Sequence, residues 1–317
     1  MNSMLKAAAV LGATVLAAPA MAQTKVSIAI SGWTGFAPLT LAKEAGIFAK
    51  NGLDVTIKKI PQASRPLAIA SGDVQCAATT VETWVVWNAN GVATTQIFQL
   101  DKSYGADGMV VRNTIASIKD VKGKQVAASA PGTAPYFTLA WFLKKNGLSA
   151  KDVTVVNMEP GPAAQAFIAG QNDVAMTYEP YLSAVREKPD AGKILVTSIE
   201  YPVVVDVLVF RKDFIEKHPK VVKATVDSFF EALDLLKRDP LRSHELMGSS
   251  VKQSGEAFAK SAAYIEWQGR DDNKSYYAKE HKPFVDFAVR VLKFNRVIQK
   301  EPKAQEMIDL RFLGPAH

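Results

Sequence analysis

The hydrophobic residues of this chain alternate between short apolar runs and longer segments with helical spacing. The run KVSIAIS at residues 25–31 precedes a helical pattern that continues to about Phe48, an Asn-Gly stop at residues 51–52, and a second run, LDVTIKKI. Short apolar runs between turn residues are typical of buried strands, and Asn-Gly is a typical signal at the end of a helix. This pattern predicts a strand–helix–strand unit.

The same order of signals recurs later in the chain. KQVAASA at residues 124–130 precedes GTAPYFTLA, a helix to about Lys145, another Asn-Gly at residues 146–147, and the strand DVTVVNM. Downstream, LAIASGDVQCAATTVE (67–82) matches AAQAFIAGQNDVAMTYEP (163–180). Chance similarity is the alternative, because all βαβ units share a period. Two paired signatures in the same order favour two α/β lobes of similar build, with mostly parallel sheets covered by helices.

Long helices are expected after the apolar run at residues 201–210. Pro219 opens a helix whose apolar residues recur at helical spacing, and others are expected over about 243–267 and 283–299. These helices have no sheet of their own, so we expect them to pack on the first lobe.

Two crossings between the lobes are expected, near residues 111–117 and 203–210. Lobe 1 then consists of residues 23–112 and 206–317, and lobe 2 of residues 113–205. The predicted fold is α/β with a cleft between the lobes. In such sheets, ligands bind beyond the carboxyl ends of the strands, where helix N-termini point outward.

The first residues, 1–22, have the pattern of a secretory signal. Lys6 precedes an uncharged, alanine-rich run, and Ala20-Met21-Ala22 is a typical cleavage pattern. A membrane anchor is the alternative, but it needs roughly 18 or more apolar residues, and this run is shorter. Cys76, the only cysteine, lies far from the cleavage position, so no lipid anchor is expected there. We expect cleavage near Ala22 and a soluble periplasmic protein.

Composition and charge argue against several classes of protein. With 317 residues and 48% hydrophobic content, the chain can bury a sizeable core. The net charge is +7, but its lysines and arginines are dispersed, so nucleic acid is not an expected partner. All four histidines lie in the expected C-terminal helical part or the tail, without a His-Glu-x-x-His pattern, and Ser129 lacks a Gly-x-Ser-x-Gly elbow. We therefore expect neither catalysis nor a metal or other cofactor.

Polar and aromatic residues follow the expected strands. Trp33 is expected to offer a flat wall to a ligand, with a core position as the alternative. Gly32-x-x-Gly35 lacks both the P-loop lysine and the three-glycine dinucleotide pattern, so a phosphate-bearing cofactor is not expected. The candidate ligand-binding residues are Trp33, Thr34, Gly35, Thr79, Thr80, Glu82, Asp101, Asp107, Gly132, Thr133, Tyr178, Glu179, Tyr181 and Asp206.

Acidic side chains are prominent in this set. Asp206 lies inside the apolar run VVVDVLVF, and an unpaired buried carboxylate is costly, so we expect a partner, either at the hinge or on the ligand. Glu82 and Glu179 have an alternative role as charges in the first turn of a helix. Acids in the cleft would repel a simple oxyanion and favour a ligand with N–H groups. Arg65 and Arg112 are candidates for an anionic end, although we expect both at the solvated surface.

Five segments, in this order, carry a family resemblance: SGWTGFAPLTLAKEAGIFAKNGLDV, AIASGDVQ, IKDVKGKQVAASAPGTAPYFTLAWFLKKNGL, FIAGQNDVAMTYEPYLS and FRKDFIEKHPKVVKA. They resemble the periplasmic substrate-binding proteins of ABC importers for nitrate, sulfonates, taurine and thiamine-pyrimidine precursors, over roughly Val26 to Leu235. The resemblance implies a two-lobed, type II binding-protein fold that closes on a small molecule and presents it to a membrane permease. Thiamine-pyrimidine synthases share this fold, but they depend on histidine and cysteine chemistry that this sequence does not display.

The resemblance leaves the ligand open. Together with the acidic residues, it favours a taurine-like amino-sulfonate or an aminopyrimidine. A plain sulfonate or another small organic anion is the alternative ligand, and a sensory binding protein is the alternative role. We expect the protein to be a monomer.

Overall fold

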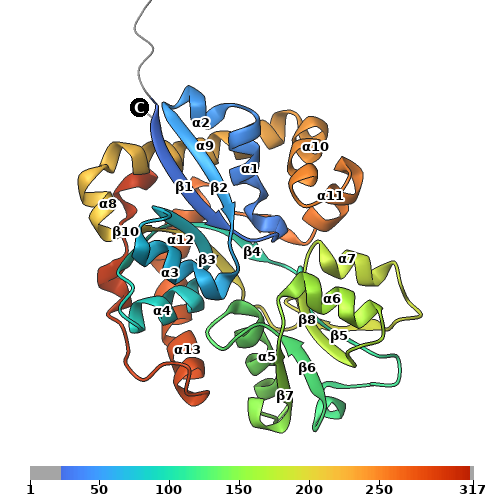
Figure 1. Cartoon of the computed structure of the whole chain (residues 1–317). Coiled ribbons are helices and arrows are strands. Elements are labelled where there is room, and N and C mark those ends of the chain that lie inside the picture. Colours follow the sequence, from blue (N-terminus) through green and yellow to red (C-terminus); the bar gives the residue numbers. More distant parts are fainter. Residues whose placement is uncertain (1–22, 315–317) are drawn as a thin grey trace, which may run out of the picture.

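Two α/β lobes lie side by side in the computed structural model, which describes residues 23–314 (Figure 1). One lobe is built on a six-stranded sheet and the other on a five-stranded sheet. The expected signal peptide, residues 1–22, lies outside the described residues. Across residues 23–314, no helix is both long enough and apolar enough to span a membrane.

The sheet of lobe 1 is mixed, in the order β11-β4-β10-β3-β1-β2. Strand β1 pairs in parallel with β2 and β3, whereas β10 runs antiparallel to β3 and β4. The strands are β1 (Thr24–Ile30), β2 (Leu53–Lys59), β3 (Cys76–Thr80), β4 (Thr94–Ser103), β10 (Val205–Arg211) and β11 (Ile265–Trp267).

The sheet of lobe 2 repeats this arrangement in the order β7-β6-β8-β5-β9. Strand β6 pairs in parallel with β7 and β8, and β5 runs antiparallel to β8, so β6, β7, β8 and β5 correspond to β1, β2, β3 and β10. The repeated strand order agrees with the repeated sequence signals. The strands are β5 (Asp107–Val111), β6 (Gln125–Ala128), β7 (Thr154–Asn157), β8 (Val174–Tyr178) and β9 (Lys193–Thr197).

The chain crosses from lobe 1 to lobe 2 earlier than the sequence predicts. Strand β4 ends at Ser103 and β5 begins at Asp107, so the first crossing is at residues 104–106 rather than 111–117. Strand β5 therefore belongs to lobe 2. Only a short turn separates the apolar runs of β4 and β5. Strand β4 pairs with β10, whereas β5 pairs with β8 and β9, and the local sequence pattern gives no sign of these distant partners.

The two crossings are joined by hydrogen bonds. The second crossing, residues 198–204, connects β9 to β10. The Ser198 hydroxyl lies 2.7 Å from the Ser103 hydroxyl and accepts a 2.8 Å bond from the Gly105 N–H. These bonds fix the two connections side by side behind the cleft.

Short helices follow the strands in both lobes (Figure 1). Pro38 and Pro135 stand in the first turns of α1 and α5, where a missing N–H removes no helical bond. In lobe 1 the helices are α1 (Ala37–Glu44), α2 (Ile47–Lys50), α3 (Arg65–Ser71) and α4 (Val81–Ala89), and in lobe 2 they are α5 (Ala134–Lys145), α6 (Pro160–Ile168) and α7 (Tyr181–Arg186).

The C-terminal helices pack mainly on lobe 1, as predicted. Helix α9 begins at Pro219 and lays Phe229 and Phe230 against Phe98 of β4, with ring centroids 5.0 and 5.4 Å away. The single helix expected over 243–267 is instead two helices and strand β11. The C-terminal helices are α8 (Lys212–Lys217), α9 (Pro219–Arg238), α10 (Pro240–Ser250), α11 (Gly255–Ala262), α12 (Arg270–Lys279) and α13 (His281–Phe294).

Candidate ligand-binding site

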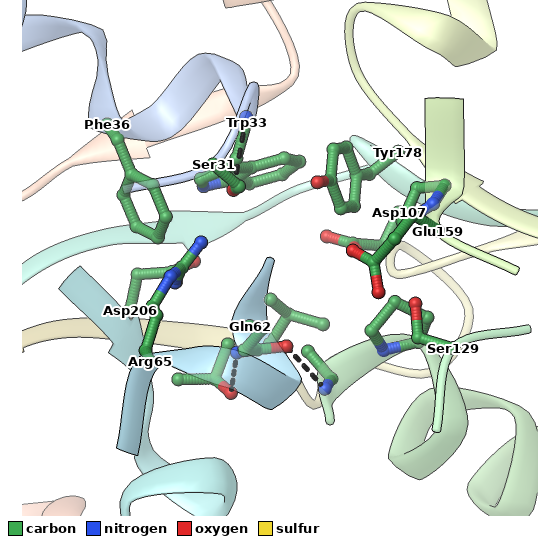
Figure 2. Close-up of a pocket in the computed structure, with 15 residues that line it drawn as sticks. Ser31, Trp33, Phe36, Gln62, Arg65, Asp107, Ser129, Glu159, Tyr178 and Asp206 are labelled. Carbon is green, nitrogen blue, oxygen red and sulfur yellow. Dashed lines mark hydrogen bonds between the residues drawn. The ribbon is translucent and has the colours of Figure 1, made fainter. Parts of the chain in front are cut away.

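A pocket lies between the lobes, where the strand ends of the two sheets face each other (Figure 2). It contains about 400 Å³ of atom-free space, a value that includes open solvent at its mouth, and only about 30 Å³ is open to the centre of a water-sized molecule, so the pocket is narrow in this arrangement of the lobes. Lobe 1 contributes Ser31, Trp33, Phe36, Gln62, Arg65, Thr80 and Asp206, lobe 2 contributes Asp107, Ser129, Ala134, Pro135, Glu159, Pro160 and Tyr178, and the second crossing contributes Val204.

Strand ends bring most of these side chains together. Thr80 and Tyr178 are the last residues of β3 and β8, and Ser31 and Ser129 directly follow β1 and β6. The carboxyl ends of parallel strands meet at one edge of a sheet, and this edge faces the other lobe in both halves of the molecule. The general position of the site therefore agrees with the sequence expectation.

Trp33 lines the pocket and contacts both lobes. Its ring packs edge-on against Tyr178 of lobe 2, with centroids 5.3 Å apart, and its Nε1 donates a 3.3 Å hydrogen bond to Asp101 Oδ1. The next residue, Thr34, donates its backbone N–H to the carbonyl of Glu179 in lobe 2 at 3.2 Å. The loop at the end of β1 therefore holds the lobes together in this closed arrangement.

Arg65 is buried in the pocket wall, not solvated as the sequence suggested. Its side chain is 1% exposed because it crosses under the β2–α3 loop, where Nε donates to the Ile60 carbonyl at 3.0 Å and Nη1 to the Ala78 carbonyl at 2.6 Å. Its Nη2 has no hydrogen-bond partner within residues 23–314. Burial lowers the pKa of Arg65 to about 10, so it remains a cation at neutral pH. The pocket thus contains a fixed cation with a free N–H donor.

Arg112 is also not a solvated residue, but it has a structural role. Its guanidinium donates to the carbonyls of Ala191 and Phe167 at 2.6 Å and of Asn172 at 2.5 Å, and stacks 4.3 Å from the Phe167 ring. It does not line the pocket. Arg112 joins the loops at the far end of lobe 2.

Two of the predicted acids, Asp107 and Asp206, line the pocket, and two others lie behind it. Asp101 pairs with Asp206 across β4 and β10, and the charge of Asp101 acts on the Asp206 carboxyl group. Glu82, at the start of α4, accepts hydrogen bonds from the Thr80 and Thr83 hydroxyls. Asp107 and Asp206 each keep one oxygen without a partner within residues 23–314.

Burial disfavours the charged form of all four acids. It raises the pKa of Glu82 to about 8 and that of Asp107 to about 7. The pKa of Asp206 is raised well above its usual range by burial and by the neighbouring Asp101, and that of Asp101 is also raised, chiefly by burial. Proton sharing within this group is therefore expected near neutral pH.

Glu179 and Tyr181 do not line the pocket. The Glu179 carboxylate forms an ion pair with Arg186 and accepts a 3.1 Å bond from the Ser183 N–H. Glu179 precedes α7 and is not in its first turn, so it binds the start of this helix from outside. Tyr181 lines an adjoining groove that also contains Lys59.

The other predicted site residues lie near the pocket without lining it. A Cβ atom on Gly35 would lie 2.5 Å from the Asp101 carboxylate, so this glycine allows close packing of protein on protein and not the approach of a ligand. The position of a residue at the end of a strand therefore predicts that it lies near the cleft, but not that its side chain faces the cavity. The residues outside the lining are Thr34, Gly35, Thr79, Glu82, Asp101, Gly132, Thr133, Glu179 and Tyr181.

Sequence reasoning missed two groups of lining residues. Ser129 and Glu159 follow strands β6 and β7 closely, so the rule that selected the other strand ends could have found them. Gln62 has no such signal. Its amide donates to the Thr79 and Thr80 hydroxyls at 3.2 and 3.4 Å and accepts from the Ala134 N–H of lobe 2 at 2.9 Å. Figure 2 shows Gln62 in the pocket wall.

No group of three or more His, Cys, Asp or Glu side chains in the described part of the chain is arranged to hold a metal ion.

Solved structures share this fold across nearly the whole chain. The alkanesulfonate-binding protein SsuA of Xanthomonas axonopodis pv. citri, bound to MOPS, has a TM-score of 0.74 at 17% identity and covers 91% of this chain and 98% of its own. The desulfurization enzyme DszB has a TM-score of 0.65 at 13% identity and covers 92% of this chain and 98% of its own. The predicted two-lobed, type II binding-protein fold is confirmed.

Sequence comparison identifies the family. The chain is 32% identical over 213 residues to the taurine-binding periplasmic protein of Escherichia coli (strain K12), a match that spans 65% of each chain and thus somewhat less than two thirds of that relative. The family described as NMT1/THI5 like matches residues 33–243, which include the whole sheet of lobe 2 and the sheet of lobe 1 except β1 and β11. The chain therefore belongs to the NMT1/THI5-like family.

Proposed function

We propose that this protein is the periplasmic solute-binding component of an ABC uptake system, and that it binds a small amino-sulfonate of the taurine class between its lobes and delivers it to a membrane permease. The observation that carries the proposal is the charge arrangement of the pocket, in which Arg65 offers a free cationic donor while Asp206 and Asp107 offer free acceptor oxygens. A molecule with an anionic end and an ammonium end matches both.

Each end of such a ligand has a chemically suited partner. The sulfonate accepts from Arg65 Nη2, and the ammonium group donates to Asp206 and Asp107. Trp33 and Phe36 supply apolar area for the carbon chain between the ends. Hydrogen bonds to charged groups contribute more than neutral ones, so the two ends supply most of the selectivity.

The names of the relatives support this class of ligand. The E. coli relative is a taurine-binding protein, and a structural neighbour binds alkanesulfonates. A plain sulfonate is the second candidate, because that neighbour favours it. Three acids at the pocket wall, Asp107, Glu159 and Asp206, favour the amino-sulfonate instead.

A binding protein is favoured over an enzyme, although the desulfurization enzyme DszB has the same fold. Cys76 is the only cysteine in the sequence, it is fully buried in β3, and it does not line the pocket. Burial raises the pKa of its thiol well above the usual range, which suppresses the nucleophilic thiolate.

A thermal-shift and calorimetric screen tests the ligand class. We expect taurine to stabilise the protein most, ahead of ethanesulfonate, which lacks the amine, and ethylamine, which lacks the sulfonate, with nitrate ineffective. Ligand at 100 times its dissociation constant adds about 2.7 kcal/mol to the free energy of unfolding. Stabilisation by ethanesulfonate but not taurine would contradict the amine part of the proposal. No response to any sulfonate would contradict the class.

A further inference from the structure

We propose that the Asp101–Asp206 pair is a proton-exchanging subsite for the ligand's ammonium group. The pair holds a shared proton while the pocket is empty and releases it to solvent when an ammonium group binds beside Asp206. This inference rests on the proposed function, because it requires a ligand with a cationic amine.

The geometry requires a proton in the empty pair. Asp101 and Asp206 are directly opposite in the β4–β10 ladder, and their side chains are 0% and 2% exposed. Their carboxyl groups interact directly, because the charge of Asp101 adds to burial in raising the pKa of Asp206. Like charges this close in a dry site do not both ionise. Trp33 Nε1 donates to Asp101 Oδ1 and holds that side chain behind Asp206.

One side of the pair is open to a ligand. Asp206 lines the pocket and Asp101 does not, so a ligand reaches the pair through Asp206 alone. The Oδ2 atoms of both side chains are buried and have no hydrogen-bond partner within residues 23–314. An ammonium group at Asp206 supplies the donor that this oxygen lacks.

The surrounding charges favour a cation at this position. The acids Asp107 of β5 and Glu82 of α4 face Asp206, and Arg65 of α3 is the cation whose charge acts on it. Lys102, beside Asp101 on β4, forms an ion pair with Glu280 instead, 2.8 Å away. Acids thus outnumber cations around the pair. An incoming ammonium group replaces a bound proton, and the net charge of the subsite stays nearly constant.

The exchange is balanced without a covalent step. The O–H bond of the shared carboxyl group breaks, its proton goes to solvent, and ammonium N–H groups donate to the resulting carboxylate. Binding therefore lowers the pKa of the pair, so the affinity for the amine rises with pH and levels off where the empty pair loses its proton. For one linked proton, the dissociation constant falls by up to about tenfold per pH unit below that point.

Isothermal titration calorimetry in two buffers with different ionisation enthalpies counts the protons. At pH 7 we expect taurine to release close to one proton per molecule bound, and ethanesulfonate, the matched ligand without an amine, to release none. Taurine binding with no net proton release would overturn this inference and leave the proposed function intact. Failure to bind any amino-sulfonate would contradict both.

Two variants separate the pair from other buried acids. In Asp101→Asn, the new amide donates to Asp206 without a shared proton, so taurine should still bind while proton release falls below half of the wild-type value. Glu82→Gln is the matched control, since it removes another buried carboxyl that does not line the pocket, and it should retain proton release. Equal release from Asp101→Asn and wild type would overturn the assignment.

Infrared difference spectroscopy gives a second measurement. Glu82 and Asp107 also contribute to the carboxylic C=O absorption, because burial raises the pKa of both. Addition of taurine should remove the intensity of about one carboxyl group from the wild-type protein, and this loss should be absent in Asp101→Asn. No loss in the wild type, or an equal loss in Asp101→Asn, would overturn the proposal.

Discussion

Two arginines, Arg65 and Arg112, for which the sequence led to the same expectation, have different roles in the structure. Arg65 uses two of its nitrogens on carbonyls of its own lobe and leaves the third facing the pocket, whereas Arg112 donates to three carbonyls within lobe 2. The planar guanidinium group can bond the protein and a ligand at the same time. A lysine has the same charge but cannot reproduce this fork.

Arg65→Lys should therefore weaken ligand binding. A hydrogen bond to a charged group contributes about 1.5–3 kcal/mol, so we expect the dissociation constant for taurine to rise by about tenfold or more. The matched control is Arg112→Lys, which should lower the melting temperature but change the dissociation constant by less than about twofold. Arg112 does not line the pocket and donates only to carbonyls of lobe 2. Calorimetry measures the first effect and thermal unfolding the second. Unchanged affinity in Arg65→Lys would show that another group binds the anionic end.

At the scale of elements, the strand ends and the Asn-Gly helix ends could be predicted from the sequence because they depend on local patterns. The side chains that face the cavity could not, because their direction depends on how the lobes meet. Gly35 illustrates the difference, since the sequence suggests close approach of a ligand and the structure places Asp101 there. Arg65 illustrates the converse, because a charged residue at the start of a helix gives no local sign that a loop covers it.

The loop between β2 and α3 makes a direct connection between the lobes. The Gln62 amide bonds Thr79 and Thr80 in lobe 1 and accepts from the N–H of Ala134, the first residue of α5 in lobe 2. The first N–H groups of a helix have no partner within the helix. Gln62 therefore satisfies a donor that loses this partner when the cleft opens.

Gln62→Ala should destabilise the closed arrangement. Loss of one such hydrogen bond costs about 1 kcal/mol, so the dissociation rate of taurine should rise by about fivefold in stopped-flow measurements, with less change in the association rate. The control is Gln75→Ala, which also removes a glutamine side chain. That side chain forms hydrogen bonds with Ser27 and Gly72, both within lobe 1. It should lower the free energy of unfolding and leave the dissociation rate unchanged. Equal rates in Gln62→Ala and wild type would contradict the role of this contact.

At the scale of the whole molecule, the lobes contact each other on two flanks besides the pocket. Helix α13, which packs on lobe 1, places Phe287 against Trp141 of α5 with ring centroids 4.5 Å apart. Near α7, the guanidinium of Arg186 in lobe 2 stacks 4.3 Å from the ring of Tyr264 in lobe 1. The sequence predicted that the C-terminal helices pack on lobe 1 but not this contact with lobe 2. The C-terminal helices therefore also stabilise the closed arrangement of the lobes.

Small-angle X-ray scattering tests this closure. We expect the radius of gyration of the wild-type protein to decrease when taurine is added, because the ligand joins charged groups of the two lobes. In Phe287→Ala, an aromatic contact worth about 0.5–1.5 kcal/mol is lost, so the ligand-free protein should be more expanded than wild type and should need more taurine to compact. Phe214→Ala is the control, because Phe214 stacks on Phe210 within lobe 1, at a centroid distance of 6.1 Å. It should scatter like wild type. A radius of gyration that is the same with and without saturating taurine would contradict ligand-driven closure. Identical scattering curves for Phe287→Ala and wild type would show that the α13–α5 contact is present in both the open and the closed protein and does not favour closure.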